Sequence, residues 1–355
     1  MYFENTSQAG NTYGFTARIL EGDKAVGIAE YKVEVTESVI PELNIILDSV
    51  KDTTLWTGKI KLHNISSGST VKGKLNFDGP ELFEDLQNIN LGIIPAGKVG
   101  EVSFALPKIS KKGLYTLEYN LCLSNGVKYD FKENIDFTLA KYADKKPVID
   151  GEIQTDEWPG DIAMYADDVS QIKNLPDWMG KNDISGFAII QWDEENVYLC
   201  AEATDDVHCN ISEAGSNWNG DNLQFGMFYG TEGFTAIGQA STKFNEISIA
   251  LNSNTGEVSV WRYLTQHSDK KIGKVENAEC MIKRDDNFQK TVYELKIPWS
   301  ELLADGEQPK EGEKVGFSFV FNETDAGLRE GWIEYAGGIA ETKNAQLFTY
   351  MTLLK

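Results

Sequence analysis

The sequence is poor in cysteine and carries no C-x-x-C pair. Its four cysteines, Cys122, Cys200, Cys209 and Cys280, are scattered over 355 residues. This spacing argues against a zinc finger or a thioredoxin-like redox motif. Cys122 and Cys200 lie in alternating apolar runs and are predicted to be small buried side chains. A bridge between Cys200 and Cys280 stays open at this stage.

Histidines and long apolar runs are also scarce. The three histidines, His63, His208 and His267, stand alone, with no H-E-x-x-H pattern, so catalytic roles for them are disfavoured. No apolar run reaches the length of a bilayer span, and no charged leader followed by an apolar segment opens the chain. Membrane insertion is therefore not expected.

Basic residues are outnumbered, with 33 Lys plus Arg against 55 Asp plus Glu and a formal net charge of -22. Such a charge repels phosphate backbones, so no nucleic acid is expected as a partner. Neutral sugars and divalent cations remain compatible with it. Most of the carboxylates are interpreted as solvated surface groups that favour solubility.

What the chain does have is a pattern of apolar residues that repeats every two positions. Runs such as Val197, Leu199, Ala201 alternate apolar and polar residues between Gly, Asn and Asp turns, which predicts antiparallel sheets with one buried face. The best helical segment is short: Ser300 is placed to cap it and Gly306 to end it. The expected fold class is all-β.

A chain of this length is expected to form at least two domains. Residues 38–140 hold about seven strand candidates at the turn spacing of an immunoglobulin-like sandwich. Residues 1–37 hold two or three strands, too few for a sandwich, and are expected to pack on something else or to be part of a truncated sandwich. Residues 141–146 are polar and precede a proline, so they are predicted to be the linker to a larger domain, residues 147–355.

From residue 147 onward the chain carries an ordered series of phrases. These are VIDGEIQTDEWPG (148–160), DISGFAIIQWDEENVYLCAEATDDVH (183–208), WNGDNLQFGMF (218–228), VYELKIPWSEL (292–302) and REGWIEYAGGIAETKNAQLF (329–348). Together and in this order they resemble the family 9 carbohydrate-binding modules of secreted bacterial enzymes. The resemblance implies a jelly-roll-like β-sandwich and non-catalytic binding of a polysaccharide or oligosaccharide. It also implies a bacterial extracellular or cell-surface location and further domains of a larger parent chain.

The tryptophans divide into two groups. Trp192, Trp261 and Trp332 lie inside alternating apolar runs and are predicted to pack in the core. Trp218 instead has only Gly, Ser, Asn and Asp for neighbours, so an exposed indole that stacks on a sugar ring is the favoured interpretation, with incidental packing as the alternative. The resemblance implies the same role for Trp218.

Further sugar contacts are predicted near Trp218. Gln224 stands where many family members have a carboxylate that holds sugar hydroxyls, and Asp221 is expected either to bind sugar or to orient the loop. The second stacking tryptophan of the family is missing from the loop Gly337–Asn344. Tyr335 or Trp178 is the candidate replacement, with packing as the alternative for each, and Asn344 is a further candidate contact.

The resemblance also implies structural calcium. Acidic loop residues supply the hard oxygen ligands that calcium prefers; the candidates are Asp150, Glu152, Asp156, Asp205 and Asp206. Solvated turn carboxylates are the alternative. For the whole protein, two other functions remain open: a structural spacer without a sugar site, and a glycoside hydrolase, which requires two paired carboxylates.

Overall fold

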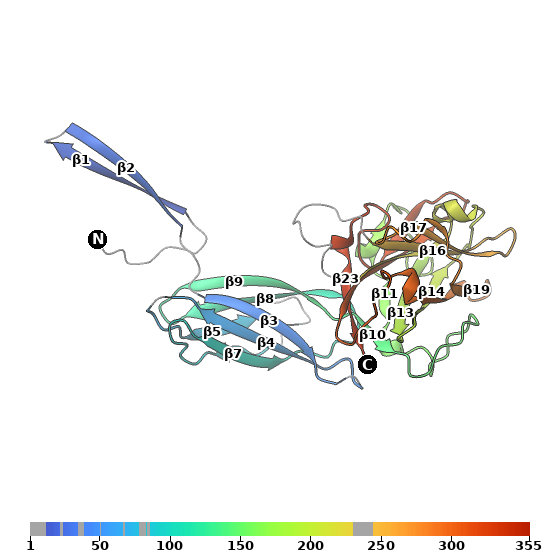
Figure 1. The fold of residues 1–355 in the computed structure, drawn as a ribbon, viewed down its shortest axis with the longest axis horizontal. Coiled ribbons are helices and arrows are strands. Elements are labelled where there is room, and N and C mark those ends of the chain that lie inside the picture. Colours follow the sequence, from blue (N-terminus) through green and yellow to red (C-terminus); the bar gives the residue numbers. More distant parts are fainter. Residues whose placement is uncertain are drawn as a thin grey trace. The chain divides into compact units, whose positions relative to one another are not determined.

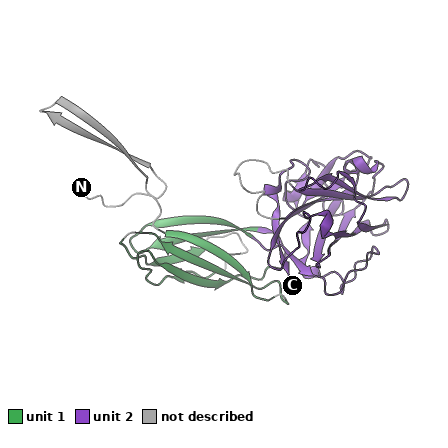
Figure 2. Ribbon diagram, in the orientation of Figure 1, with its two compact units in different colours: residues 1–109, 115–135 green, residues 110–114, 136–355 purple. Residues whose placement is uncertain are grey.

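The computed structural model describes residues 12–21, 24–34, 39–49, 51–66, 68–77, 83, 86–229 and 244–355. Its contacts divide the chain into two units, residues 1–109 with 115–135 and residues 110–114 with 136–355 (Figure 2). The elements are strands joined by turns and short 3-10 helices. The all-β prediction is confirmed.

The first elements form a two-stranded hairpin. Strand β1 (Thr12–Glu21) pairs antiparallel with β2 (Lys24–Glu34), in agreement with the two or three strands expected in residues 1–37. What this segment packs against lies outside the described residues.

The rest of the first unit contains two sheets. The first is β3 (Val39–Leu47), β4 (Trp56–Asn64) and β7 (Val99–Ala105); the second is β6 (Ile89–Asn90), β5 (Gly73–Phe77), β8 (Leu114–Leu123) and β9 (Lys128–Asp136). Ile60, Leu62, Leu75 and Leu117 are buried between more exposed neighbours, as a period of two requires. The immunoglobulin-like topology stays a prediction.

The second unit is built from one curled sheet of 14 strands (Figure 1). Its strands run along the sheet in the order β18 (Gly273–Lys274), β17 (Val258–Leu264), β16 (Asn245–Leu251), β15 (Asn222–Tyr229), β21 (Lys314–Glu323), β23 (Thr349–Leu354), β10 (Leu139–Tyr142), β13 (Ile184–Trp192), β14 (Asn196–Asp205), β20 (Lys290–Pro298) and β19 (Glu279–Asp285). Strand β11 (Met164–Ala166) pairs with β13, β12 (Ile172–Lys173) with β22, and β22 (Gly331–Glu334) also with β21.

Strand β10 lies where the sequence predicts a linker. It pairs in parallel with both β13 and β23, and its residues Leu139 and Ala140 are buried. Lys141 and Tyr142 are therefore part of the second unit's sheet. The polar composition of 141–146 indicated a connection, but the strand before it had already entered the sheet.

The two faces of β15 and β21 differ in character. Leu223, Phe225 and Met227 of β15 point into the main core together with Phe317, Phe319 and Phe321 of β21. The alternate residues on these strands face the other side and include Gln224 and Asn322, which are hydrogen-bonded to each other. The main core thus holds the sheet from one side, while the opposite side carries polar groups beside a smaller apolar cluster that includes Phe228 and Val320.

Several local predictions can be compared with the structure. The hairpin turn at Asp193 to Asn196 is confirmed between β13 and β14, and Trp192 and Trp332 are buried as expected, whereas Trp261 is only partly buried. All four cysteines are free, so the bridge between Cys200 and Cys280 is absent.

The predicted helix is wrong. Only a 3-10 turn, η6 (Trp299–Glu301), forms there, and Ser300 lies inside it rather than capping it. Gly306 does have the expected positive φ of 86°. Burial of Trp299 and Leu302 holds the segment as a turn against the core, because tertiary packing overrides weak helical propensity.

Candidate functional site

A pocket of about 380 Å³ opens on the polar face of the second unit. Its lining comes from β15, β16, β17 and the segments on either side of β22. The residues are Trp218, Gln224, Glu246, Tyr263, Leu264, Arg329, Ala340 and Lys343. Register explains their convergence, because β16 and β21 both flank β15 and side chains of the same parity share one face.

Trp218 lies on the 3-10 helix η4 (Ala214–Asn219) with 39 % of its surface exposed. Its neighbour Asn217 is buried and anchors the turn. The Asn217 Oδ1 accepts from Ser248 Oγ at 2.6 Å and from Tyr263 OH at 2.5 Å, and its Nδ2 donates to Ser259 Oγ at 3.1 Å. With Asn217 held inward, the next side chain points out of the turn, which places the indole at the pocket.

A hydrogen-bonded chain of polar side chains crosses three strands beneath the pocket. Lys343 Nζ donates to Glu246 Oε1 at 2.6 Å, and Gln224 Nε2 donates to the same oxygen at 2.9 Å. Asn322 Nδ2 then donates to Gln224 Oε1 at 2.6 Å, and Arg329 donates to Asn322 Oδ1 at 3.1 Å. This series of hydrogen bonds therefore begins at the side chain of Lys343 and ends at that of Arg329.

Glu246 carries the negative charge of this chain. Its side chain is fully buried, and its Oε2 has no hydrogen-bond partner among the described residues. Burial raises the pKa of Glu246, while the charge and hydrogen bond of Lys343 oppose that shift. A buried, unsatisfied acceptor next to a pocket is suited to receive a hydroxyl from a ligand.

Arg329 is fixed between two aromatic rings. Its guanidinium carbon lies 5.0 Å from the ring centroid of Trp218 and 4.8 Å from that of Trp332. Such cation–π contacts hold an arginine in place without consuming its hydrogen-bond donors. Trp332 is buried while Trp218 is exposed, so Arg329 connects the core to the pocket wall.

Of the six residues predicted to bind sugar, Trp218 and Gln224 line this pocket and four do not. Asp221 is buried and accepts backbone hydrogen bonds from Cys209 and from Thr324; its two expected roles, sugar contact and loop orientation, stay predictions. The Tyr335 ring stacks on Phe319 with centroids 5.3 Å apart.

Trp178 and Asn344 also have structural partners elsewhere. Trp178 packs against the main core and donates from Nε1 to the carbonyl of Ile184 at 3.2 Å. Asn344 caps the 3-10 helix η7 (Ala345–Leu347) by accepting from the Gln346 backbone N–H at 3.1 Å.

Sequence reasoning missed Glu246, Tyr263, Arg329 and Lys343 as pocket residues. Glu246 had a detectable signal, because it is a charged residue inside the alternating run Ile247, Ile249. Lys343 belongs to the same loop as the predicted Asn344. For Tyr263 and Arg329 no sequence signal was available, since their position depends on which strands become neighbours.

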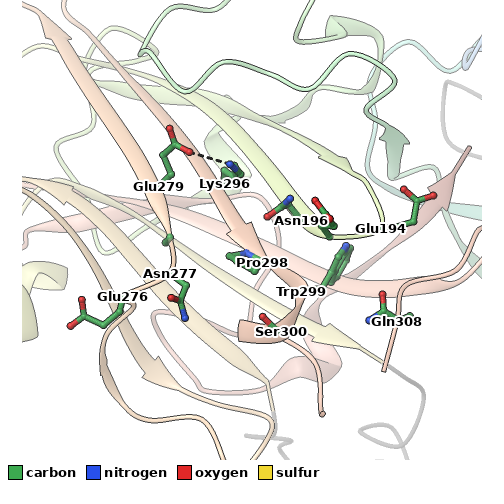
Figure 3. Close-up of a pocket in the computed structure, with 12 residues that line it drawn as sticks. Glu194, Asn196, Glu276, Asn277, Glu279, Lys296, Pro298, Trp299, Ser300 and Gln308 are labelled. Atoms are coloured by element: carbon green, nitrogen blue, oxygen red, sulfur yellow. Dashed lines mark hydrogen bonds and ion pairs between the residues drawn. The ribbon is translucent and has the colours of Figure 1, made fainter. Parts of the chain in front are cut away.

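A second, wider pocket of about 670 Å³ lies elsewhere on this unit. Figure 3 shows its polar lining, including the ion pair between Glu279 and Lys296 at 3.2 Å. Its tryptophan, Trp299, is buried and donates from Nε1 to the carbonyl of Asp193. This pocket therefore presents no exposed aromatic face, in contrast to the pocket at Trp218.

Two acidic residues, Asp205 before η4 and Asp221 after it, come together with His208 in the structure. Oxygens of Asp205 and Asp221 and the Nδ1 of His208 lie within 4.8 Å of one another. Burial raises the pKa of Asp205 to about 6, with Arg284 opposing the shift. Burial, followed by the charges of Asp221 and Asp205, raises the pKa of Glu323 to about 11.

This cluster has the chemistry of a cation site. Asp206 Oδ1 and Glu323 Oε2 are buried and have no hydrogen-bond partner among the described residues. Carboxylate oxygens are the ligands that calcium prefers, and a divalent cation would offset the mutual repulsion of these groups. Asp205 and Asp221 therefore fit calcium. Asp206 interacts electrostatically with Asp205, and Glu323 with both, so these two are further candidate ligands.

The other three predicted calcium ligands are engaged elsewhere. Asp156 pairs with Lys145 at 2.6 Å and Glu152 with Lys283 at 3.1 Å. Asp150 accepts from the backbone N–H of Glu152 at 3.0 Å. Their role as calcium ligands stays a prediction.

The second unit is thus an all-β fold with a partly exposed tryptophan at a polar pocket. A family model described as "Carbohydrate family 9 binding domain-like" matches residues 149–355. The chain belongs to this family, as its sequence phrases indicated. Among curated proteins no sequence matches the chain.

Solved structures give similar matches at low identity. A family 9 carbohydrate-binding module from Caldicellulosiruptor kristjanssonii in complex with cellotriose has a TM-score of 0.42 and 19 % identity, covering 61 % of this chain and 93 % of that one. Its complex with glucose has a TM-score of 0.42 and 18 % identity, covering 61 % and 95 %. A putative carbohydrate-binding protein from Bacteroides uniformis ATCC 8492 has a TM-score of 0.40 and 8 % identity, covering 61 % and 97 %.

In the part of the chain that the structure describes, no helix is long and apolar enough to cross a membrane.

Proposed function

We propose that this chain binds carbohydrate in the pocket at Trp218 and so directs a larger secreted or cell-surface bacterial protein to a polysaccharide. The observation that carries the proposal is the exposed indole of Trp218 next to the unsatisfied Glu246 Oε2 in one pocket. An indole is a platform for the apolar face of a sugar ring, and the polar floor receives hydroxyls. Membership of the family supports the same class of ligand.

The expected affinity is modest. Covering on the order of 100 Å² of apolar surface on Trp218 contributes roughly 2.5 kcal/mol. A few hydrogen bonds add about 1 kcal/mol each, and the loss of translational freedom opposes both. These terms lead to a dissociation constant on the order of 0.01–1 mM. Several such modules on one chain would raise the effective affinity for a polymer.

Binding is favoured over hydrolysis by the contents of the pocket. Among the lining residues that the structure describes, Glu246 is the one carboxylate, and it is paired with Lys343. Glycoside hydrolysis uses two carboxyl groups on either side of the scissile bond. A spacer without a sugar site is disfavoured by the exposure of Trp218, which a purely structural tryptophan does not require.

The test is a glycan array followed by titration calorimetry on the full chain. Trp218→Ala should abolish binding and leave the melting temperature unchanged within a few degrees. Trp192→Ala is the control, because it removes a buried indole and should destabilise the fold by about 3–5 kcal/mol. Full glycan affinity in Trp218→Ala, or sugar released from a polysaccharide above background, would contradict the proposal.

We also propose that calcium binds at the cluster of Asp205, Asp206, Asp221 and Glu323. When bound, calcium would neutralise buried carboxylates and hold together the segments that carry them. Asp221 already joins two of these segments through the backbone N–H groups of Cys209 and Thr324. Asp221 follows η4 directly in sequence, so an ion there would also steady the turn that presents Trp218.

A further inference from the structure

Arg329 is the starting point, because it is a pocket-lining arginine without a carboxylate partner. In the described part of the chain its one side-chain hydrogen bond goes to Asn322 Oδ1 at 3.1 Å, and no described carboxylate forms an ion pair with it. A guanidinium has five N–H donors, so most remain available to a ligand. The two tryptophan contacts fix it in place.

The pocket as a whole is positively charged. Its ionisable lining residues with a formal charge are Arg329, Lys343 and Glu246. Lys343 and Glu246 pair with each other, which leaves the charge of Arg329 uncompensated within the lining. This is unusual in a chain with a net charge of -22. A neutral sugar would not require it.

We infer that the pocket selects a sugar unit that carries one negative group, a uronic acid carboxylate or a sulfate ester, with Arg329 as the residue that recognises the charge. This inference rests on the proposed function. Arginine binds planar oxyanions through two parallel N–H bonds, and such charge-assisted bonds are stronger than bonds to hydroxyls. Lys343, half-exposed at the other end of the polar chain, supplies a second positive group.

The arrangement also explains how the pocket tolerates Glu246. Lys343 and Gln224 both donate to its Oε1. These partners offset the negative charge of the carboxylate, which reduces its repulsion of an anionic group on the ligand. Its unpartnered Oε2 accepts from a hydroxyl of the same sugar ring. One ring can thus use Trp218 for stacking, Glu246 for a hydroxyl and Arg329 for the charge.

The experiment compares matched neutral and acidic sugars on the full chain by titration calorimetry. The probes are methyl β-glucoside, methyl β-glucuronide and glucose 6-sulfate, with the galactose series in parallel. We expect at least one acidic sugar to bind about ten-fold or more tightly than its neutral counterpart at low salt. This preference should shrink as ionic strength rises, because the pocket is open to solvent. The carboxylate and sulfate arms identify which anion is preferred.

Two variants with the same change in net charge make the test specific. Arg329→Gln should reduce the preference to less than about three-fold, whereas Lys274→Gln should keep it, because Lys274 is exposed on β18 and pairs with Glu276. Arg329→Lys should retain part of the preference, because lysine keeps the positive charge but lacks the paired N–H donors of the guanidinium. Melting temperatures check that each variant is folded.

The outcomes separate this inference from the proposed function. Neutral sugars that bind as well as acidic ones, with binding lost in Trp218→Ala, overturn the inference and leave carbohydrate binding intact. A preference for acidic sugars that survives Arg329→Gln also overturns the inference, because a group other than Arg329 then binds the anionic group. No binding of any sugar in either series, on the array or by calorimetry, overturns both.

Discussion

The ammonium group of Lys343 lies 2.6 Å from Oε1 of Glu246, a glutamate whose side chain is fully buried. This pair closes the polar chain under the pocket at its β16 end. Removing one partner leaves a buried charge without compensation, whereas removing both does not.

We therefore expect Lys343→Met to destabilise the chain by about 1–3 kcal/mol, at the low end if solvent reaches Glu246 through the open pocket. The double variant Lys343→Met with Glu246→Gln should recover part of that loss. Urea unfolding of the single and double variants measures the coupling between the two residues. Additive effects would show that the pair contributes nothing beyond its separate side chains.

Asn217→Ala should weaken both stability and sugar binding. The substitution removes three side-chain hydrogen bonds and leaves buried hydroxyls unpaired, at a cost of about 1–3 kcal/mol. Since Asn217 holds η4, Trp218 should also lose its position. Asn219→Ala is the matched control on the same turn, because the structure shows no hydrogen bond from its described side chain. Equal effects of the two variants would contradict the anchoring role.

Calcium should raise the melting temperature of the chain relative to the same protein in chelator, because a ligand that binds only the folded state adds to stability. Glu323→Gln should remove most of that increase. Asp156→Asn should retain it, because Asp156 pairs with Lys145 on another loop. Identical melting temperatures with calcium and with chelator would show that this chain does not bind calcium in its folded state.

The folding stability of the calcium-free protein should fall as pH rises, while the stabilisation that calcium adds should increase. Burial raises the pKa of Asp205 from its ordinary 3.8 to about 6, so the metal-free folded state binds more protons than the unfolded state in this window. Stability of the metal-free protein is therefore fully retained below the unfolded pKa and is lost as pH rises through about 6.

Calcium competes with those protons, so its stabilising effect should grow over the same range. Melting curves at about pH 5 and about pH 8, in metal-free buffer and with calcium, measure both trends. Asp205→Asn should flatten the metal-free trend. A calcium effect that is larger at the acidic end would contradict the assignment of these carboxylates.

Residues 136–355 should fold alone and be more stable than residues 147–355. The shorter fragment lacks β10, which pairs with β13 and β23 and buries Leu139. Burial of a leucine contributes about 1.5–3 kcal/mol, to which the lost hydrogen bonds of β10 add. Chemical denaturation of the two fragments makes the comparison. Equal stabilities would show that β10 is dispensable and that the domain begins where the polar segment 141–146 ends.

Sequence alone determined the fold class and the family. Alternating residues such as Leu223, Phe225 and Met227 specify a strand with one buried face whatever its neighbours are, because the period is local. The sequence also sufficed to predict Trp218 and Gln224 as pocket residues. An indole surrounded by small polar residues has nothing adjacent to bury it, and Gln224 follows at the opposite parity from the core residues of β15.

Only the tertiary structure decided which residues share the pocket with them. Glu246, Tyr263, Arg329 and Lys343 come from segments far apart in the chain and meet because β16 and β21 flank β15. The tertiary structure also brought Asp205 beside Asp221, but not Asp150, Glu152 and Asp156, which looked equivalent as acidic loop residues. Strand neighbours are set by how the whole sheet buries its apolar face, a global balance that no short stretch of sequence contains.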